Sequence, residues 1–126
     1  MTLDDRLQTI EEFVKRSDDE FDNGGNAMVA AEILWGALAH CLIALAEINE
    51  WRCEGHQGYR EVARRLDSAD QPGRWSSDFA AGEQLHTYFY QRNLQPGELQ
   101  SRRSASRFAV RQLVPTIRRQ IGLQNP

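Results

Sequence analysis

Apolar side chains recur at intervals of three and four residues along most of this chain, which is the period of an α-helix with one buried face. The first such stretch follows Thr2, a residue that can cap a helix, and it carries acidic side chains in its first turn. Asn23 and the two glycines after it end this stretch, and Asn26 can cap the next one. The third stretch is short and ends near Asp67. The periodicity predicts helices over about residues 3–22, 27–48, 59–66, 75–91 and from residue 96 onward.

Turn residues and prolines separate these stretches. The run Ser68–Gly73, with the sequence SADQPG, is the clearest loop. Pro96 suits the first turn of the last helix, whereas Pro115 lies inside its apolar pattern, so we expect a kink or an early end at about Val114. No segment alternates apolar and polar residues for long enough to form a strand. The sequence therefore predicts one all-α domain over residues 1–126, a bundle of about five helices.

The second stretch, residues 27–48, is apolar on nearly every side and long enough to span a membrane. Glu32, His40 and Glu47 argue against a span, because one charged side chain near the centre of a bilayer costs about 2.5–3.5 kcal/mol. Seven alanines and Gly36 allow neighbouring helices to approach closely. We therefore expect the central helix of a soluble bundle. Since the N-terminus shows no basic-then-apolar leader, we also expect a cytoplasmic protein.

Composition fits an ordinary folded domain, with 126 residues, 40% hydrophobic and 26% charged, and a mean hydropathy of −0.61. The net charge of −3 hides an asymmetry: residues 1–50 carry eleven acidic and three basic side chains, whereas residues 92–126 carry seven arginines and one glutamate. Arg103, Arg107 and Arg111 lie four residues apart and form a stripe along the last helix. This stripe is either a solvated face paired with the acidic first helix or a surface for RNA or another polyanion.

The two cysteines, Cys41 and Cys53, do not form the clustered C-x-x-C pairs of a zinc ribbon. In a chain with no secretory signal, we expect both thiols to be reduced rather than joined in a disulfide.

Two polar side chains interrupt the apolar face of the central helix. Glu32 and His40 lie four residues to either side of Gly36, so we expect all three on one face, with the glycine leaving room for a pocket. The alternative is that Glu32 and His40 satisfy each other or backbone groups inside the bundle, because buried polar groups need partners whether or not they act.

The other two histidines lie on or near the third and fourth helices. Glu83, His86 and Tyr90 share one helical face, and His56 stands just ahead of the third helix. We expect the three histidines, Glu32 and Tyr90 to converge in a cleft between the second and fourth helices. Such a cluster fits a pH-sensitive hydrogen-bond network or a small-anion pocket. A metal site is the alternative, and no H-E-x-x-H or similar spacing supports it.

Two motifs in these helices resemble signatures of the PaREP1-like branch of the HEPN superfamily. The residues that carry the resemblance are Glu32, Trp35, Gly36 and Ala37 in the central helix and Leu85, His86, Phe89 and Tyr90 in the fourth. The glycine pair before the central helix and His56 also match the family pattern. The chain departs from the pattern at Tyr88, where the family has an asparagine.

The resemblance implies a HEPN-like helical bundle that forms a homodimer and acts as a binding or regulatory module for a nucleotide or another anion, with no cofactor or metal ion. It also suggests a nucleotidyltransferase-type protein as a partner. The number of tryptophan and other aromatic side chains adds to the expectation of self-association. The ligand-binding residues that it implies are Glu32, Trp35, His40, His56, His86 and Tyr90.

A metal-independent endoribonuclease toxin of a toxin-antitoxin or defence system is the alternative function. Catalytic members of the superfamily carry an arginine a few positions before a histidine. Here Arg52 has only three residues between it and His56, and eleven residues separate Arg74 from His86. A dimer could supply Arg52 or Arg92 from the second copy, but the unmatched spacing favours a non-catalytic protein.

Overall fold

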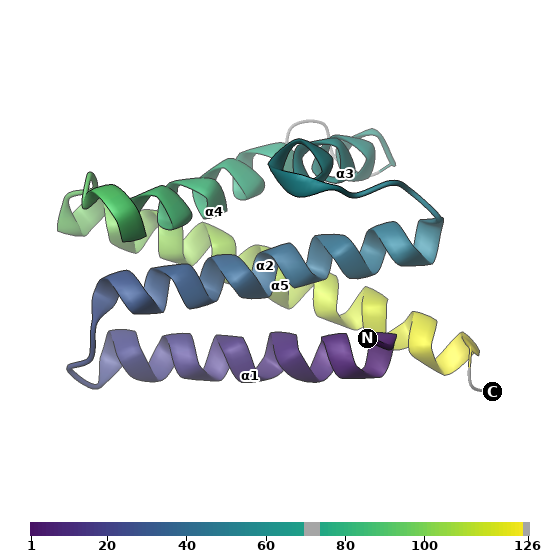
Figure 1. Cartoon of the computed structure of the whole chain (residues 1–126), viewed down its shortest axis with the longest axis horizontal. Helices are drawn as coiled ribbons and strands as arrows, with labels where there is room; N and C mark the ends of the chain where they lie inside the picture. Colours follow the sequence, from purple (N-terminus) through teal and green to yellow (C-terminus); the bar gives the residue numbers. More distant parts are fainter. Residues whose placement is uncertain (70–73, 125–126) are drawn as a thin grey trace.

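The computed structural model describes residues 1–69 and 74–124 and consists of five α-helices (Figure 1). These are α1 (Leu3–Asp22), α2 (Ala27–Asn49), α3 (Gly55–Ala69), α4 (Arg74–Gln91) and α5 (Pro96–Gln124). The described part of the chain contains no strand. The prediction of an all-α bundle of about five helices is therefore confirmed.

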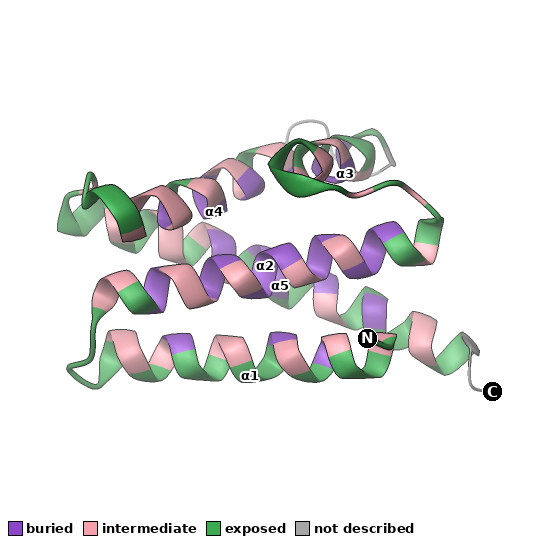
Figure 2. Cartoon of the chain, viewed as in Figure 1, coloured by how far each residue is buried: buried purple, intermediate pink, exposed green. Residues whose placement is uncertain are grey.

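Helix α2 occupies the middle of the bundle and packs against each of the other four helices. In Figure 1, α1 runs along one flank of α2, α3 and α4 lie on the opposite flank, and α5 crosses behind. Twelve residues of α2 are buried, including six of its seven alanines, so the small side chains allow its neighbours to come close on several sides (Figure 2). The prediction that residues 27–48 form the central helix is confirmed.

Side-chain caps fix where α1 and α2 begin. The Thr2 hydroxyl accepts a hydrogen bond from the amide of Asp5 at 3.1 Å, and the Asp5 carboxylate accepts one from the amide of Thr2 at 3.2 Å. The Asn26 side chain accepts hydrogen bonds from the amides of Met28 and Val29 at 2.9 and 3.2 Å. Both helix starts agree with the sequence prediction.

Helix α3 is longer than the sequence predicts at both ends. It begins at Gly55 rather than near Tyr59, because its first turn is polar and exposed and so carries no apolar period. Ser68, the first residue of the predicted loop, is still helical. The expected loop residues 70–73 lie outside the described residues.

Asp67 joins the end of α3 to the start of α4. Its buried carboxylate accepts hydrogen bonds from the backbone amides of Trp75 at 2.5 Å and Ser76 at 3.1 Å. These amides belong to the first turn of α4, where a helix leaves its N–H groups without intrahelical partners. The contact thereby sets the position of α4 relative to α3.

The sequence predicts a kink or an early end at about Val114. Helix α5 continues through Pro115 to Gln124, so the second of these alternatives, the early end, is wrong. Pro115 removes one helical hydrogen bond, at a cost of about 3 kcal/mol in a helix interior. Leu113 and Ile117 are buried in the main core on either side of the proline, and this packing holds the helix together.

Of the described helices, α2 alone is long and apolar enough to cross a membrane by length and composition. In this structure, 61% of its most apolar 18-residue window is buried inside the fold. A core helix of a bundle meets the same criteria of length and composition, because it too must be apolar on most sides.

The two cysteines are both free thiols. Cys41 is fully buried in α2, and Cys53 is half-buried just before α3. Burial raises the pKa of both thiols above the usual value, which keeps them protonated and unreactive.

The close contact between α2 and α4 depends on Gly82. A Cβ atom at this position would lie 2.6 Å from Leu38 Cδ2 and 3.1 Å from Trp35 Cε3. We expect Gly82→Ala to lower the free energy of unfolding by about 1–3 kcal/mol, because overpacking outweighs the helix propensity that alanine adds. Urea denaturation followed by circular dichroism measures the change.

The matched control for this prediction is Gly122→Ala in α5, where an added Cβ meets nothing within 4 Å. This variant should be neutral or more stable by up to about 1 kcal/mol. Equal stabilities for the two variants would contradict the close-packing account.

Candidate functional site

Two histidines meet on a buried tryptophan where α2, α3 and α4 come together. The His56 ring stacks on the Trp35 ring with 5.4 Å between centroids and 3° between planes. The His86 ring lies 5.6 Å from Trp35 and 5.1 Å from His56. We call this group, together with Glu32 and Glu83, the histidine cluster.

Each imidazole of the histidine cluster has a carboxylate beside its Nδ1 atom. His86 Nδ1 lies 2.7 and 3.0 Å from the two carboxylate oxygens of Glu32. An ionised carboxylate only accepts, so Nδ1 of His86 donates the hydrogen bond and Nε2 stays available. His56 Nδ1 lies 3.6 Å from Glu83 Oε2, and Glu83 also accepts two hydrogen bonds from Arg60, at 2.9 and 3.2 Å.

The indole of the histidine cluster is buried, and its imidazoles are partly exposed to solvent. Trp35 is only 6% exposed, whereas the side chains of His56 and His86 are 47% and 28% exposed. Tyr90 is largely exposed, and its ring stands edge-on to His86 at 5.3 Å between centroids. A molecule approaching from solvent therefore meets the two imidazoles before it meets the indole.

The structure brings together all the predicted ligand-binding residues except His40. His40 faces α1, where Arg6 Nη1 lies 3.1 Å from its Nδ1 atom and the Phe13 ring packs edge-on at 5.7 Å. The prediction that His40 joins the cluster is wrong, and so is the alternative that Glu32 and His40 satisfy each other. Their separation of eight positions turns an α-helix by about 80° beyond two full turns and advances it by about 12 Å.

Gly36 also has a different role from the predicted one. It does not open a pocket between polar groups, because a Cβ atom there would lie 3.0 Å from Cε2 of Phe13. The glycine instead lets the Phe13 ring of α1 lie directly against α2.

The arginine stripe is largely engaged with the acidic first helix. Arg103 forms ion pairs with Asp18 at 3.1 Å and Asp22 at 3.0 Å, and Arg107 pairs with Asp18 at 2.9 Å. Within the described ranges, Arg111 forms no ion pair. The predicted pairing with the acidic first helix is therefore observed for Arg103 and Arg107, although the Arg103 side chain is only 13% exposed and so is not a solvated one.

Sequence reasoning did not single out Arg60. A signal for it was present, since Arg60 follows His56 by four residues and so lies on the same face of α3. Glu83 was noted only as a neighbour of His86 on α4, and its contact with both residues of α3 appears in the tertiary structure.

The histidine cluster can bind anions and transfer protons. Imidazole nitrogens act as hydrogen-bond donors, acceptors or general acids and bases, and a carboxylate on Nδ1 holds the ring in one orientation. Among residues 1–69 and 74–124, no group of three or more His, Cys, Asp or Glu side chains is arranged to hold a metal ion.

Comparison with protein-family models, curated proteins and solved structures gave no significant match for this chain.

The ion pairs of Asp18 should make the stability of the bundle sensitive to acid. Burial raises the pKa of Asp18, but hydrogen bonds and charge from Arg107 and Arg103 outweigh it and hold the pKa below its usual value. We expect Asp18→Asn to lose about 1–2 kcal/mol of unfolding free energy at neutral pH. As the pH falls below about 4, the unfolded chain takes up a proton on Asp18 before the folded protein does, so the difference should shrink.

Urea titrations at several pH values measure this difference. Asp19→Asn is the control, because Asp19 is exposed on the same helix and its side chain forms no ion pair with the described residues. A constant difference between wild type and Asp18→Asn down to about pH 3 would show that the Asp18 charge is not what stabilises the contact.

The stability of the bundle should also depend on pH through His40, which becomes positively charged when it takes up a proton. Burial, together with the positive charge of Arg6, lowers the pKa of His40 below its usual value. The unfolded chain then binds a proton more readily than the folded one, so stability should fall as the pH drops through about 6.5. In His40→Gln this part of the pH dependence should disappear, as measured by unfolding at about pH 8, 6 and 5. A variant with the same pH profile as wild type would contradict the assignment.

Proposed function

We propose that this protein is a HEPN-like homodimeric binding module whose histidine cluster recognises a nucleotide or another phosphate-bearing anion. The observation that carries the proposal is the pair of accessible imidazoles, His56 and His86, 5.1 Å apart on Trp35 with a carboxylate behind each. Two imidazoles this close can donate hydrogen bonds to one small group of oxygen atoms.

The charges of the cluster favour an anion when the imidazoles are protonated. Glu32 and Glu83 each stand on the Nδ1 side of a ring. With both rings protonated and Arg60 beside Glu83, the positive charges outnumber the carboxylates by one. A phosphate bound at the exposed side of the rings would pair with this excess positive charge.

The residues behind the family resemblance support the same proposal. Glu32 and Trp35 come from the motif in α2, and His86 and Tyr90 come from the motif in α4. The two motifs are far apart in sequence and meet at His86, which contacts Glu32, Tyr90 and the Trp35 ring. A shared ligand site is one reason for two distant motifs to have a common meeting point.

The proposed homodimer rests on the family resemblance alone, because the aromatic side chains do not support it. Trp35, Trp75 and Phe79 are buried within a single chain, so they do not leave the large aromatic surface that the sequence suggested. Exposed apolar side chains remain at Tyr90 and Val29. A nucleotidyltransferase-type partner and a cytoplasmic location belong to the same proposal.

A metal-independent endoribonuclease is the second candidate. The Glu32–His86 hydrogen bond leaves the His86 Nε2 atom free to act as a base, and the neighbouring His56 can act as an acid. Such a mechanism would differ from the arginine–histidine pattern of catalytic HEPN proteins. RNA contact through Arg103 and Arg107 is disfavoured, because both arginines are paired with acidic residues of α1.

Calorimetric titration with ATP and with inorganic phosphate tests the proposed function. We expect His56→Gln and His86→Gln each to weaken ATP binding by about tenfold or more, since each removes a charge-assisted hydrogen bond. His40→Gln is the matched control, because this third histidine lies outside the cluster and the variant should bind like wild type.

An absence of ATP and phosphate binding, or an equal effect of all three variants, would contradict the proposal. Incubation of the same proteins with total RNA separates the two candidates. Degradation by wild type and His40→Gln, and not by His86→Gln, would favour the ribonuclease instead.

A further inference from the structure

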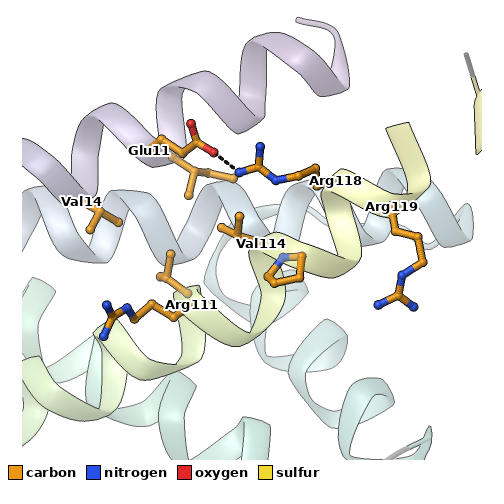
Figure 3. Close-up of a pocket in the computed structure, with 9 residues that line it drawn as sticks. Glu11, Val14, Arg111, Val114, Arg118 and Arg119 are labelled. Atoms are coloured by element: carbon orange, nitrogen blue, oxygen red, sulfur yellow. Dashed lines mark hydrogen bonds and ion pairs between the residues drawn. The ribbon is translucent and has the colours of Figure 1, made fainter. Parts of the chain in front are cut away.

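A groove of about 630 Å³ lies between α1 and the C-terminal half of α5 and shares no residue with the histidine cluster (Figure 3). Its apolar lining consists of Ile10, Val14, Val110, Val114 and Pro115. Its charged lining consists of Glu11, Arg111, Arg118 and Arg119. The groove thus combines a hydrocarbon floor with a mainly basic rim.

Two of the three rim arginines have no acidic partner among the residues that the structure describes. Arg118 forms an ion pair with Glu11, whereas Arg111 and Arg119 form no ion pair with any residue in the described ranges. Figure 3 shows Arg111 and Arg119 at the two ends of the groove, with Val114 between them. Eight residues along a helix correspond to about 12 Å, so two cationic ends are separated by an apolar stretch of that length.

The size of the groove indicates a small molecule rather than a protein as its occupant. Its volume of about 630 Å³ falls within the range of roughly 300–1,000 Å³ that small-molecule pockets occupy. A stable protein partner would contact about 20–30 residues on each side. Nine residues line this groove, which is too few for such an interface but enough to surround a small molecule.

We propose that the groove binds one molecule of a free fatty acid, an unbranched hydrocarbon chain with a terminal carboxylate. The chain lies along Val14, Val114 and Pro115, where it leaves water. The carboxylate pairs with Arg111 or Arg119 at one end of the groove, since a guanidinium is well matched to a carboxylate. This site is independent of the proposed function of the histidine cluster.

Calorimetry with dodecanoate and with dodecyltrimethylammonium, each below its micelle concentration, tests the proposal. The two probes have the same chain and opposite charges. We expect one dodecanoate per protein chain, bound about tenfold or more tightly than the cation. The affinity for dodecanoate should fall as the salt concentration rises.

Variants assign the binding to the groove. The double variant Arg111→Gln/Arg119→Gln should bind dodecanoate about tenfold or more weakly than wild type. Arg102→Gln is the matched control, because it removes an arginine from α5 outside the groove and should change nothing. Val114→Trp fills the floor and should abolish binding, with circular dichroism as the check that the variant is folded.

Three outcomes would overturn the proposal. The first is equal affinity for the two probes, and the second is unchanged dodecanoate binding in the double variant. The third is an absence of dodecanoate binding, and two further measurements then identify the occupant. Binding to phosphatidylglycerol vesicles would indicate a membrane surface, and a wild-type dimer that the double variant converts to a monomer would indicate a second copy of the chain.

Discussion

The burial of α2 is the constraint on which the rest of the structure depends. When a helix is apolar on nearly every side, exposing it to water costs free energy along its whole length, so other helices must cover it. Four helices do so here, and α1, α3, α4 and α5 take their positions from their contacts with α2. The alanines of α2 and Gly82 of α4 let these neighbours come close enough to exclude water. The burial thus determines the architecture, and the ion pairs between α1 and α5 add to it at the surface.

The same constraint explains why the polar groups of α2 have partners from different helices. A polar side chain on a covered helix must be satisfied by whichever neighbour faces it. Glu32 faces α4 and meets His86, whereas His40 and Glu47 face α1 and share Arg6. The proposed ligand site arises on the first of these sides, where α3 also approaches and adds a second imidazole.

Much of the fold could be predicted from the local sequence pattern, and the exceptions are the start of α3 and the course of α5 at Pro115. The caps at Thr2 and Asn26 depend on residues within a few positions, so the sequence was sufficient to place both helix starts. The start of α3 was missed because its first turn is polar and solvated. The sequence left open whether α5 ends or continues at Pro115, because a proline has a known local cost, while the packing of Ile117 that offsets it comes from distant residues.

The sequence by itself determined the all-α class, the five helices and the central position of α2, and it gave the pairing of acidic α1 with basic α5 as one of two alternatives. These follow from periodicity, composition and charge, which are properties of single segments or of whole segments compared with one another. Only the tertiary structure decided that His56 and His86 share the Trp35 ring, that His40 belongs to α1, and that Arg111 is left without an acidic partner among the described residues. The reason is geometric: the rotation of one helix against another decides which side chains meet, and no pattern within a helix contains that angle.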